Sequence, residues 1–169
     1  RILQGSVFSL PIERAGHAYV LGGGHVAQAL VPLLSKLDFS PVVYDDREEF
    51  ASKALVPDAE KVICAPFECF SSLLCVRTCD RLVIMTRGHA YDHAVLVQAL
   101  RTPACYIGLI GSKNKIAHTK ALLLEQGFTQ SDFARVHTPI GLPIKAQTPM
   151  EIAVSVAAEM ILDRATQQA

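Results

Sequence analysis

Short apolar runs alternate with amphipathic stretches along most of this chain, and no other feature of the sequence constrains its fold as strongly. Five runs are rich in Val and Ile and lack a clean period of two, which is typical of parallel strands buried on both faces. These strand candidates are His17 to Leu21, Pro41 to Tyr44, Lys61 to Ala65, Arg81 to Thr86 and Ala104 to Ile110. The helix candidates between them are His25 to Leu37, Glu48 to Leu55, Phe67 to Cys75, Tyr91 to Leu100 and Ser112 to Gln126. This rhythm predicts an α/β fold with three layers and a doubly wound, mostly parallel sheet.

The composition predicts a single globular domain with a sizeable core. Of the 169 residues, 50% are apolar and 19% are charged, which excludes a disordered segment. Sixteen basic residues balance sixteen acidic ones, so the chain offers no basic surface for a nucleic acid or an anionic membrane. No apolar run reaches the ~18 residues that span a bilayer, and no signal peptide precedes the first strand, so we expect a cytoplasmic protein. Because the chain opens with Arg1 and not Met, we expect residues 1–14 to be a linker or the remnant of a missing N-terminal region, and residues 15–169 to form the domain.

The cysteines and paired histidines do not predict a metal site. Five cysteines are an odd number without a C-x-x-C pair, which favours free thiols packed as small apolar residues. Cys75 and Cys79 share a helical spacing, as do His89 and His93, but two ligands do not make a site. We therefore expect no structural metal.

A glycine-rich segment follows the first strand candidate directly and opens a helix. Gly22-Gly23-Gly24-His25-Val26-Ala27 fits the pattern G-x-G-x-x-A of dinucleotide-binding folds, which makes the domain Rossmann-like. Gly22 permits the tight turn, Gly24 lets a pyrophosphate approach the backbone, and Ala27 allows the helix to pack closely on the strand. We place Gly22 to Val26 in a cofactor-binding site at the helix N-terminus, where free N–H groups favour an anion. An ordinary turn between a strand and a helix is the alternative.

Two adjacent carboxylates end the second strand candidate. Asp45 and Asp46 lie about 20 residues beyond the glycine loop, where such folds place the acidic residue that binds a ribose 2′-hydroxyl. Two carboxylates would repel a 2′-phosphate and so favour NAD over NADP, although the neighbouring Arg47 weakens that preference. We include all three residues in the expected cofactor site. The alternative is a turn with two solvated aspartates.

Polar residues also follow the fourth and fifth strand candidates, whose ends should lie beside the glycine loop. After the fourth strand we expect Thr86, Arg87 and His89 to face the ligand, with Asp92 and His25 close by; helix capping and surface chemistry are the alternative. After the fifth strand, Gly111, Ser112 and Lys113 form a helix start that Ser112 can cap. Lys113 and Lys115 stand where the helix dipole disfavours cations, which indicates an anion site or else two solvated lysines. The apolar loop from His137 to Ile144 either lines a pocket or is buried.

The last helix candidate begins with a clear signal and is apolar over most of its circumference. Thr148 can cap it, Pro149 suits the first position, and Glu151 completes a capping box. Its polar stripe is too narrow for an ordinary solvent-exposed side and consists of Glu151, Ser155, Glu159 and Asp163. A second apolar face must therefore meet a missing domain, another copy of the chain or a client enzyme, and we expect a homodimer.

Several longer motifs occur here in one order and resemble a known family. They are G-G-G-H-V-A-Q-A-L, D-D-R-E-E-F-A, T-R-G-H-A-Y-D, Y-I-G-L-I-G-S-K-N-K and P-I-G-L-P-I-K-A-Q-T-P-M-E-I-A-V-S-V-A-A-E-M-I. Over about residues 15 to 165 the chain is similar to the C-terminal Rossmann domain of the XdhC/CoxI family of xanthine dehydrogenase accessory proteins. Family members usually carry a further N-terminal domain. The chain departs from the family pattern at Gly23, where another small residue is common, and at Pro143, where a polar residue is common.

The resemblance implies a role in maturing molybdenum hydroxylases. Such proteins are thought to bind the molybdenum cofactor, a molybdopterin in some forms joined to a nucleotide, to assist its sulfuration and to deliver it to a xanthine dehydrogenase-like client. A cysteine desulfurase is a further expected partner. The ligand-facing residues carried over by motif are Gly22, Gly24, His25, Asp45, His89, Gly111, Ser112 and Lys113. This role is that of a non-catalytic accessory protein, and no catalytic residue is assigned.

Two other functions remain open from the sequence. An NAD(P)-dependent oxidoreductase would need a proton donor or acceptor near the nicotinamide, and His25 and His89 are the candidates. A nucleotide-sensing regulatory domain would need no chemistry.

Overall fold

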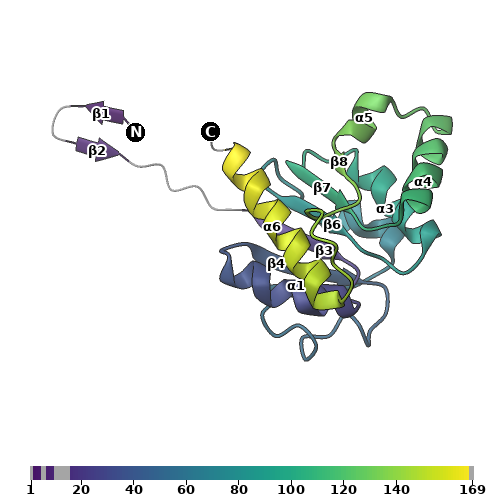
Figure 1. The fold of residues 1–169 in the computed structure, drawn as a ribbon. Helices are drawn as coiled ribbons and strands as arrows, with labels where there is room; N and C mark the ends of the chain where they lie inside the picture. Colours follow the sequence, from purple (N-terminus) through teal and green to yellow (C-terminus); the bar gives the residue numbers. More distant parts are fainter. Residues whose placement is uncertain (1, 5–6, 10–15, 168–169) are drawn as a thin grey trace.

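The computed structural model describes residues 2–4, 7–9 and 16–167, without the side chains of residues 2–4, 7–9, 89, 90 and 113. Its centre is a six-stranded parallel sheet in the order β5-β4-β3-β6-β7-β8, which confirms the predicted doubly wound α/β fold (Figure 1). The strands are β3 (His17–Leu21), β4 (Ser40–Asp45), β5 (Lys61–Cys64), β6 (Arg81–Ile84), β7 (Tyr106–Leu109) and β8 (Val136–His137). The chain runs outward from β3 to β5 and then returns to the other side of β3 for β6. The switch point, where such sheets bind ligands, therefore lies at the carboxyl ends of β3 and β6.

Helices cover both faces of the sheet. The α1 and α6 helices lie side by side on one face, and α3 and α4 lie on the other (Figure 1). The helices are α1 (His25–Lys36), the 3-10 turn η1 (Phe67–Cys69), α2 (Phe70–Leu73), α3 (His89–Ala99), α4 (Lys113–Glu125), α5 (Gln130–Ala134) and α6 (Pro149–Gln167). The α1 helix continues through Pro32. No helix in the described ranges is both long enough and apolar enough to cross a bilayer.

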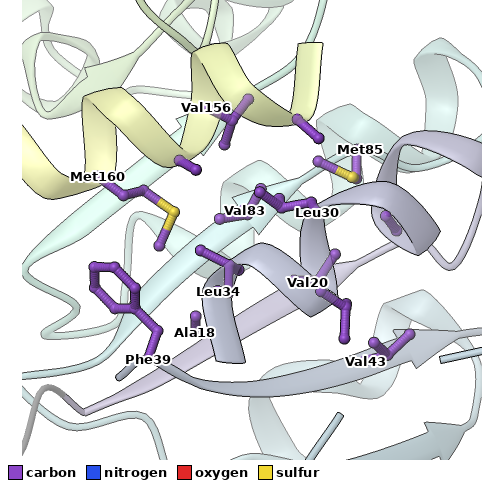
Figure 2. Close-up of a cluster of buried hydrophobic side chains, with 14 of the residues drawn as sticks. Ala18, Val20, Leu30, Leu34, Phe39, Val43, Val83, Met85, Val156 and Met160 are labelled. Carbon is purple, nitrogen blue, oxygen red and sulfur yellow. The ribbon is translucent and has the colours of Figure 1, made fainter. Parts of the chain in front are cut away.

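The central strands bury side chains on both faces, as their sequences predict. Val20 and Val83 face α1 and α6, where they pack with Leu30, Val156 and Met160 (Figure 2). Neighbouring residues of the same strands point the other way, and Leu21 and Ile84 join a second cluster beneath α3. Because neither face of the sheet is exposed to water, the strands do not alternate between apolar and polar residues.

The α6 helix has its polar residues turned inward. Ser155 is buried and donates to the carbonyl of Leu142 at 2.7 Å, and Asp163 pairs with the buried Arg81 at 3.2 Å. Glu159 accepts a hydrogen bond from the Tyr106 hydroxyl at 3.3 Å and also contacts the Gly141 amide and His137. The large exposed side chains beside Glu151 are apolar instead and are Met150, Val154, Ile161 and Leu162. The predicted second apolar face of α6 is therefore present and exposed, whereas the polar stripe, apart from Glu151, faces the protein.

The sequence-based element assignment fails in three places. The predicted helix Glu48 to Leu55 is wrong, because this segment forms turns. The Arg47 guanidinium packs over the Phe50 ring there, with Cζ 3.7 Å from the ring centre. The predicted helix Phe67 to Cys75 is reduced to η1 and α2. The short elements α5 and β8 are absent from the prediction. The prediction of a linker over residues 1–14 lies partly outside the described residues; within it, β1 (Ile2–Gln4) and β2 (Val7–Ser9) pair with each other.

Candidate functional site

The glycine loop connects β3 to α1, and its three glycines have different roles. Gly22 has a φ of +119°, and a Cβ atom there would lie 2.3 Å from the carbonyl oxygen of Met85. A Cβ on Gly23 would lie 2.4 Å from the carbonyl oxygen of Phe50. Gly24 has an ordinary φ of −66° and nothing within 4 Å of its Cβ position. The fold therefore requires Gly22 and Gly23, whereas at Gly24 the missing side chain leaves open space above the loop.

The N-terminus of α1 begins at this open space. The first hydrogen bond of the helix runs from the Gln28 amide to the Gly24 carbonyl at 3.0 Å, which leaves the preceding N–H groups without a helical partner. The Gln28 side chain donates to the Gly23 carbonyl at 3.1 Å and holds the loop in place. His25 is exposed and Val26 is half-buried at the helix start. This geometry suits an anion at Gly24, as the sequence pattern predicts.

Asp45 supports the loop from below. Its side chain is fully buried, and Oδ2 accepts a hydrogen bond from the Gly23 amide at 2.8 Å. Both carboxylate oxygens also accept hydrogen bonds from the Arg47 guanidinium, at 3.0 and 3.1 Å. Burial alone would raise the pKa of Asp45, but the hydrogen bonds from Arg47 and Gly23 outweigh it and lower the pKa below its usual value. In this structure Asp45 therefore offers no free carboxylate to a ribose, because the protein itself occupies both oxygens.

Asp46 and Arg87 form a bridge between the two loops that flank the glycine loop. Asp46 follows β4 and Arg87 follows β6, and these strands flank β3 on either side. The Arg87 guanidinium donates to Asp46 Oδ2 at 2.9 Å and lies 5.2 Å from the centre of the Tyr91 ring. The structure thus brings the predicted residues Arg87 and Asp46 together at the switch point.

Three further predicted residues form a buried polar cluster beside this bridge. Thr86, at the end of β6, donates to Asp92 Oδ1 at 2.6 Å. The other oxygen of Asp92 forms an ion pair with Lys115 of α4, and Asp92 is fully buried. Asp92 therefore does not face a ligand, and Lys115 is not a free cation for the expected anion site. The cluster joins α3 to α4 and fixes the start of α4 next to the switch point.

The remaining predicted residues lie at the same edge of the sheet. The Ser112 hydroxyl caps α4 by accepting from the Lys115 amide at 3.4 Å, as predicted. Gly111 lies under the Lys115 side chain, because a Cβ atom at Gly111 would be 3.1 Å from Lys115 Cδ. The backbones of His89 and Lys113 begin α3 and α4, and their side chains lie outside the described part of the structure. Among the described side chains, no three His, Cys, Asp or Glu residues gather closely enough to hold a metal ion.

Sequence reasoning missed one polar cluster on the α6 side of the sheet. Glu159 lies 2.8 Å from Nδ1 of His137, and the rings of His137 and Tyr106 are 4.4 Å apart. Burial and the neighbouring Glu159 raise the pKa of Tyr106 above its usual value. The signals in the sequence are a tyrosine within an otherwise apolar strand and Glu159 in the polar stripe of the last helix. This cluster holds the loop after β8 against α6.

The motifs that build this edge are those of a known family. A family model of the XdhC Rossmann domain matches residues 18–160. The chain belongs to the XdhC family. The match covers the whole six-stranded sheet except His17, and it covers α6 as far as Met160.

Relatives of this XdhC domain are longer proteins. The chain is 33% identical over 159 residues to a probable xanthine dehydrogenase subunit of Bacillus subtilis, covering 94% of this chain and 46% of that protein. It is 31% identical over 143 residues to the uncharacterized protein YqeB of Escherichia coli, covering 84% of this chain and 26% of that protein. A crystal structure of a xanthine dehydrogenase from Bacillus halodurans superposes with a TM-score of 0.81 at 31% identity, covering 90% of this chain and 45% of that one. The chain thus spans less than half the length of these relatives.

Proposed function

We propose that this XdhC domain is an accessory domain for a xanthine dehydrogenase-type molybdenum enzyme and binds a phosphate-bearing form of the molybdenum cofactor at the switch point. The names of two relatives support the link to xanthine dehydrogenase. In this proposal the domain holds the cofactor during its sulfuration by a cysteine desulfurase and passes it to the client enzyme. The cofactor supplies the oxygen- and electron-transfer chemistry of that client.

The observation that carries the proposal is the open space over Gly24 beside free backbone N–H groups, with Arg87 on the neighbouring loop after β6. A phosphate group fits these partners because both are hydrogen-bond donors and neither carries negative charge. In a nucleotide form of the cofactor, ribose hydroxyls would reach Asp46, which lies on the other side of the loop. The residues that would hold the group are thus Gly24, His25 and Val26 by their backbone, and Arg87 and Asp46 by their side chains.

The test replaces Gly24 by Val and measures binding of ADP and of NAD by calorimetry. A side chain at Gly24 enters the space that the phosphate needs, so we expect affinity for ADP to fall by at least about tenfold, or 1.4 kcal/mol. The melting temperature should stay nearly unchanged, because Gly24 has an ordinary φ and no neighbour near its Cβ position.

Gly22→Ala is the matched control, since its Cβ would meet the Met85 carbonyl and should lower the melting temperature. Equal ADP affinity in the parent and Gly24→Val would contradict the assignment of the site. A second readout is the transfer of cofactor to a cofactor-free xanthine dehydrogenase, where the parent should restore activity and Gly24→Val should not. NAD binding tighter than ADP binding, without transfer, would favour the oxidoreductase alternative.

A further inference from the structure

The ion pair between Asp46 and Arg87 joins the two loops that flank the glycine loop at the carboxyl edge of the sheet. Asp46 and Arg87 come from the loops after β4 and β6, and the glycine loop after β3 runs between them. In the proposed function a phosphate over Gly24 also binds the Arg87 guanidinium, which is the group that Asp46 now holds. The pair and the phosphate therefore compete for Arg87.

The two partners differ in how well the protein satisfies them. The Arg87 side chain is 47% exposed, so its ion pair is screened by water and contributes little to folding. The Asp46 side chain is only 14% exposed, and its Oδ1 is buried with no hydrogen-bond partner among the described residues. Its nearest cation on that side is Arg47 Nε at 3.8 Å, which is too long for a hydrogen bond. Asp46 Oδ1 is thus closed to a ligand in this structure, and the oxygen that a ligand hydroxyl would take over is Oδ2, which Arg87 now holds.

We propose that the Arg87–Asp46 pair is a latch over the glycine loop, opened efficiently only by a ligand that carries both an anionic phosphate and hydroxyl groups. This inference rests on the proposed function, because it assumes that the glycine loop binds phosphate. The phosphate takes Arg87, and a hydroxyl group donates to Asp46 Oδ2, the oxygen that Arg87 has left. Each half of the broken ion pair then has a new partner.

A ligand with only one of these groups breaks the ion pair without giving both Arg87 and Asp46 a new partner. Pyrophosphate alone removes Arg87 and leaves the Asp46 carboxylate without its closest cation. Adenosine alone must displace Arg87 from Asp46 without offering a negative charge in return. The latch therefore selects nucleotide-type ligands over free phosphates and over nucleosides.

The test measures the affinity of pyrophosphate, adenosine and ADP for the parent and for two variants of the full chain. In Asp46→Asn the guanidinium is free, so we expect pyrophosphate to bind about threefold more tightly and adenosine more weakly. In Arg87→Gln the carboxylate is free, so adenosine should bind about threefold more tightly and pyrophosphate more weakly. ADP should bind more weakly to both. Opposite changes of this kind cannot come from loss of folding, which would weaken binding of every ligand.

Glu48→Gln is the matched control, because it removes one negative charge from an exposed residue of the same loop without touching Arg87. The latch is overturned if Asp46→Asn raises pyrophosphate affinity no more than Glu48→Gln does, or if Arg87→Gln leaves adenosine affinity unchanged. Tight ADP binding without these opposite changes rejects the latch and leaves the phosphate site in place. If the parent binds none of the three ligands, the latch and the phosphate site are both wrong.

Discussion

The buried carboxylate of Asp92 and the ammonium group of Lys115 hold α3 and α4 together beside the site. Asp92 is fully buried and has two partners, the Thr86 hydroxyl and the Lys115 ammonium. Removing one partner of a buried ion pair leaves an uncompensated charge, which costs about 3–5 kcal/mol. We expect Lys115→Met to lower the free energy of unfolding by this amount, measured by urea denaturation.

Lys36→Met is the control for this prediction, because Lys36 is exposed and its loss should change stability by less than about 0.5 kcal/mol. The double variant Asp92→Leu with Lys115→Met should recover much of the loss, since no unpaired charge remains. A single variant Lys115→Met as stable as the control would mean that the pair does not stabilise the fold.

The same residues show what the sequence can and cannot predict about the site. The glycine loop and the positions of Asp45 and Asp46 follow from strand ends and spacing, and the structure places them together. The partners of each side chain do not follow, because they depend on which charged residues come within reach in space. Arg47 turns back onto Asp45, and Lys115 of α4 forms an ion pair with Asp92 of α3. Nothing in the neighbouring sequence indicates that these charges form internal pairs and not ligand contacts.

At the scale of whole elements, long periodic segments are predicted well and short ones are not. The five strand candidates and α1, α3 and α4 match the structure within a few residues, because burial on the sheet imposes their pattern. The segment Glu48 to Leu55 has helix-forming residues, but contacts of Phe50 with Arg47 and the glycine loop hold it in turns. The inward direction of the polar stripe on α6 is not predictable, because two of its partners, Tyr106 and Arg81, are distant in sequence.

The inward polar side of α6 leads to a prediction about the loop after β8. Glu159 contacts the Tyr106 hydroxyl, the Gly141 amide and His137, so it ties this loop and β8 to the helix. Glu159→Leu leaves these donors without an acceptor, and we expect it to lower the free energy of unfolding by about 2–3 kcal/mol. Amide hydrogen exchange at Gly141 and Leu142 should accelerate in the same variant, because the loop loses its anchor.

Glu125→Leu serves as the comparison on α4, where the glutamate is exposed, and it should leave both measurements nearly unchanged. If hydrogen exchange in the loop is the same in Glu159→Leu and in the parent, other contacts anchor the loop. The bond from the Ser155 hydroxyl to the Leu142 carbonyl is the first candidate for that role.

At the scale of the whole molecule, helices cover both faces of the sheet, and one of them, α6, has apolar side chains on its outward side. Met150, Val154 and Ile161 recur on one side of the helix, with Leu162 beside them, and all four are exposed. The polar residues Ser155, Glu159 and Asp163 of this helix instead face the protein, where they form hydrogen bonds or ion pairs. An exposed apolar helix face of this kind is typical of an interface, and we expect two copies of the chain to associate through it.

The prediction is that the parent forms a dimer in sedimentation velocity and that Val154→Glu shifts it to monomer at the same concentration. Val154 is 45% exposed, so a glutamate there can remain in water in the monomer and should change the melting temperature little. In the dimer the same charge would be buried without a partner, which costs several kcal/mol and is enough to dissociate a modest interface. Ala121→Glu adds the same charge to an exposed position on α4, on the other face of the sheet, and should leave the dimer intact. A parent that sediments as a monomer up to high concentration would show that α6 does not pair with itself. Dissociation by Ala121→Glu as strongly as by Val154→Glu would place the interface elsewhere or make net charge the cause.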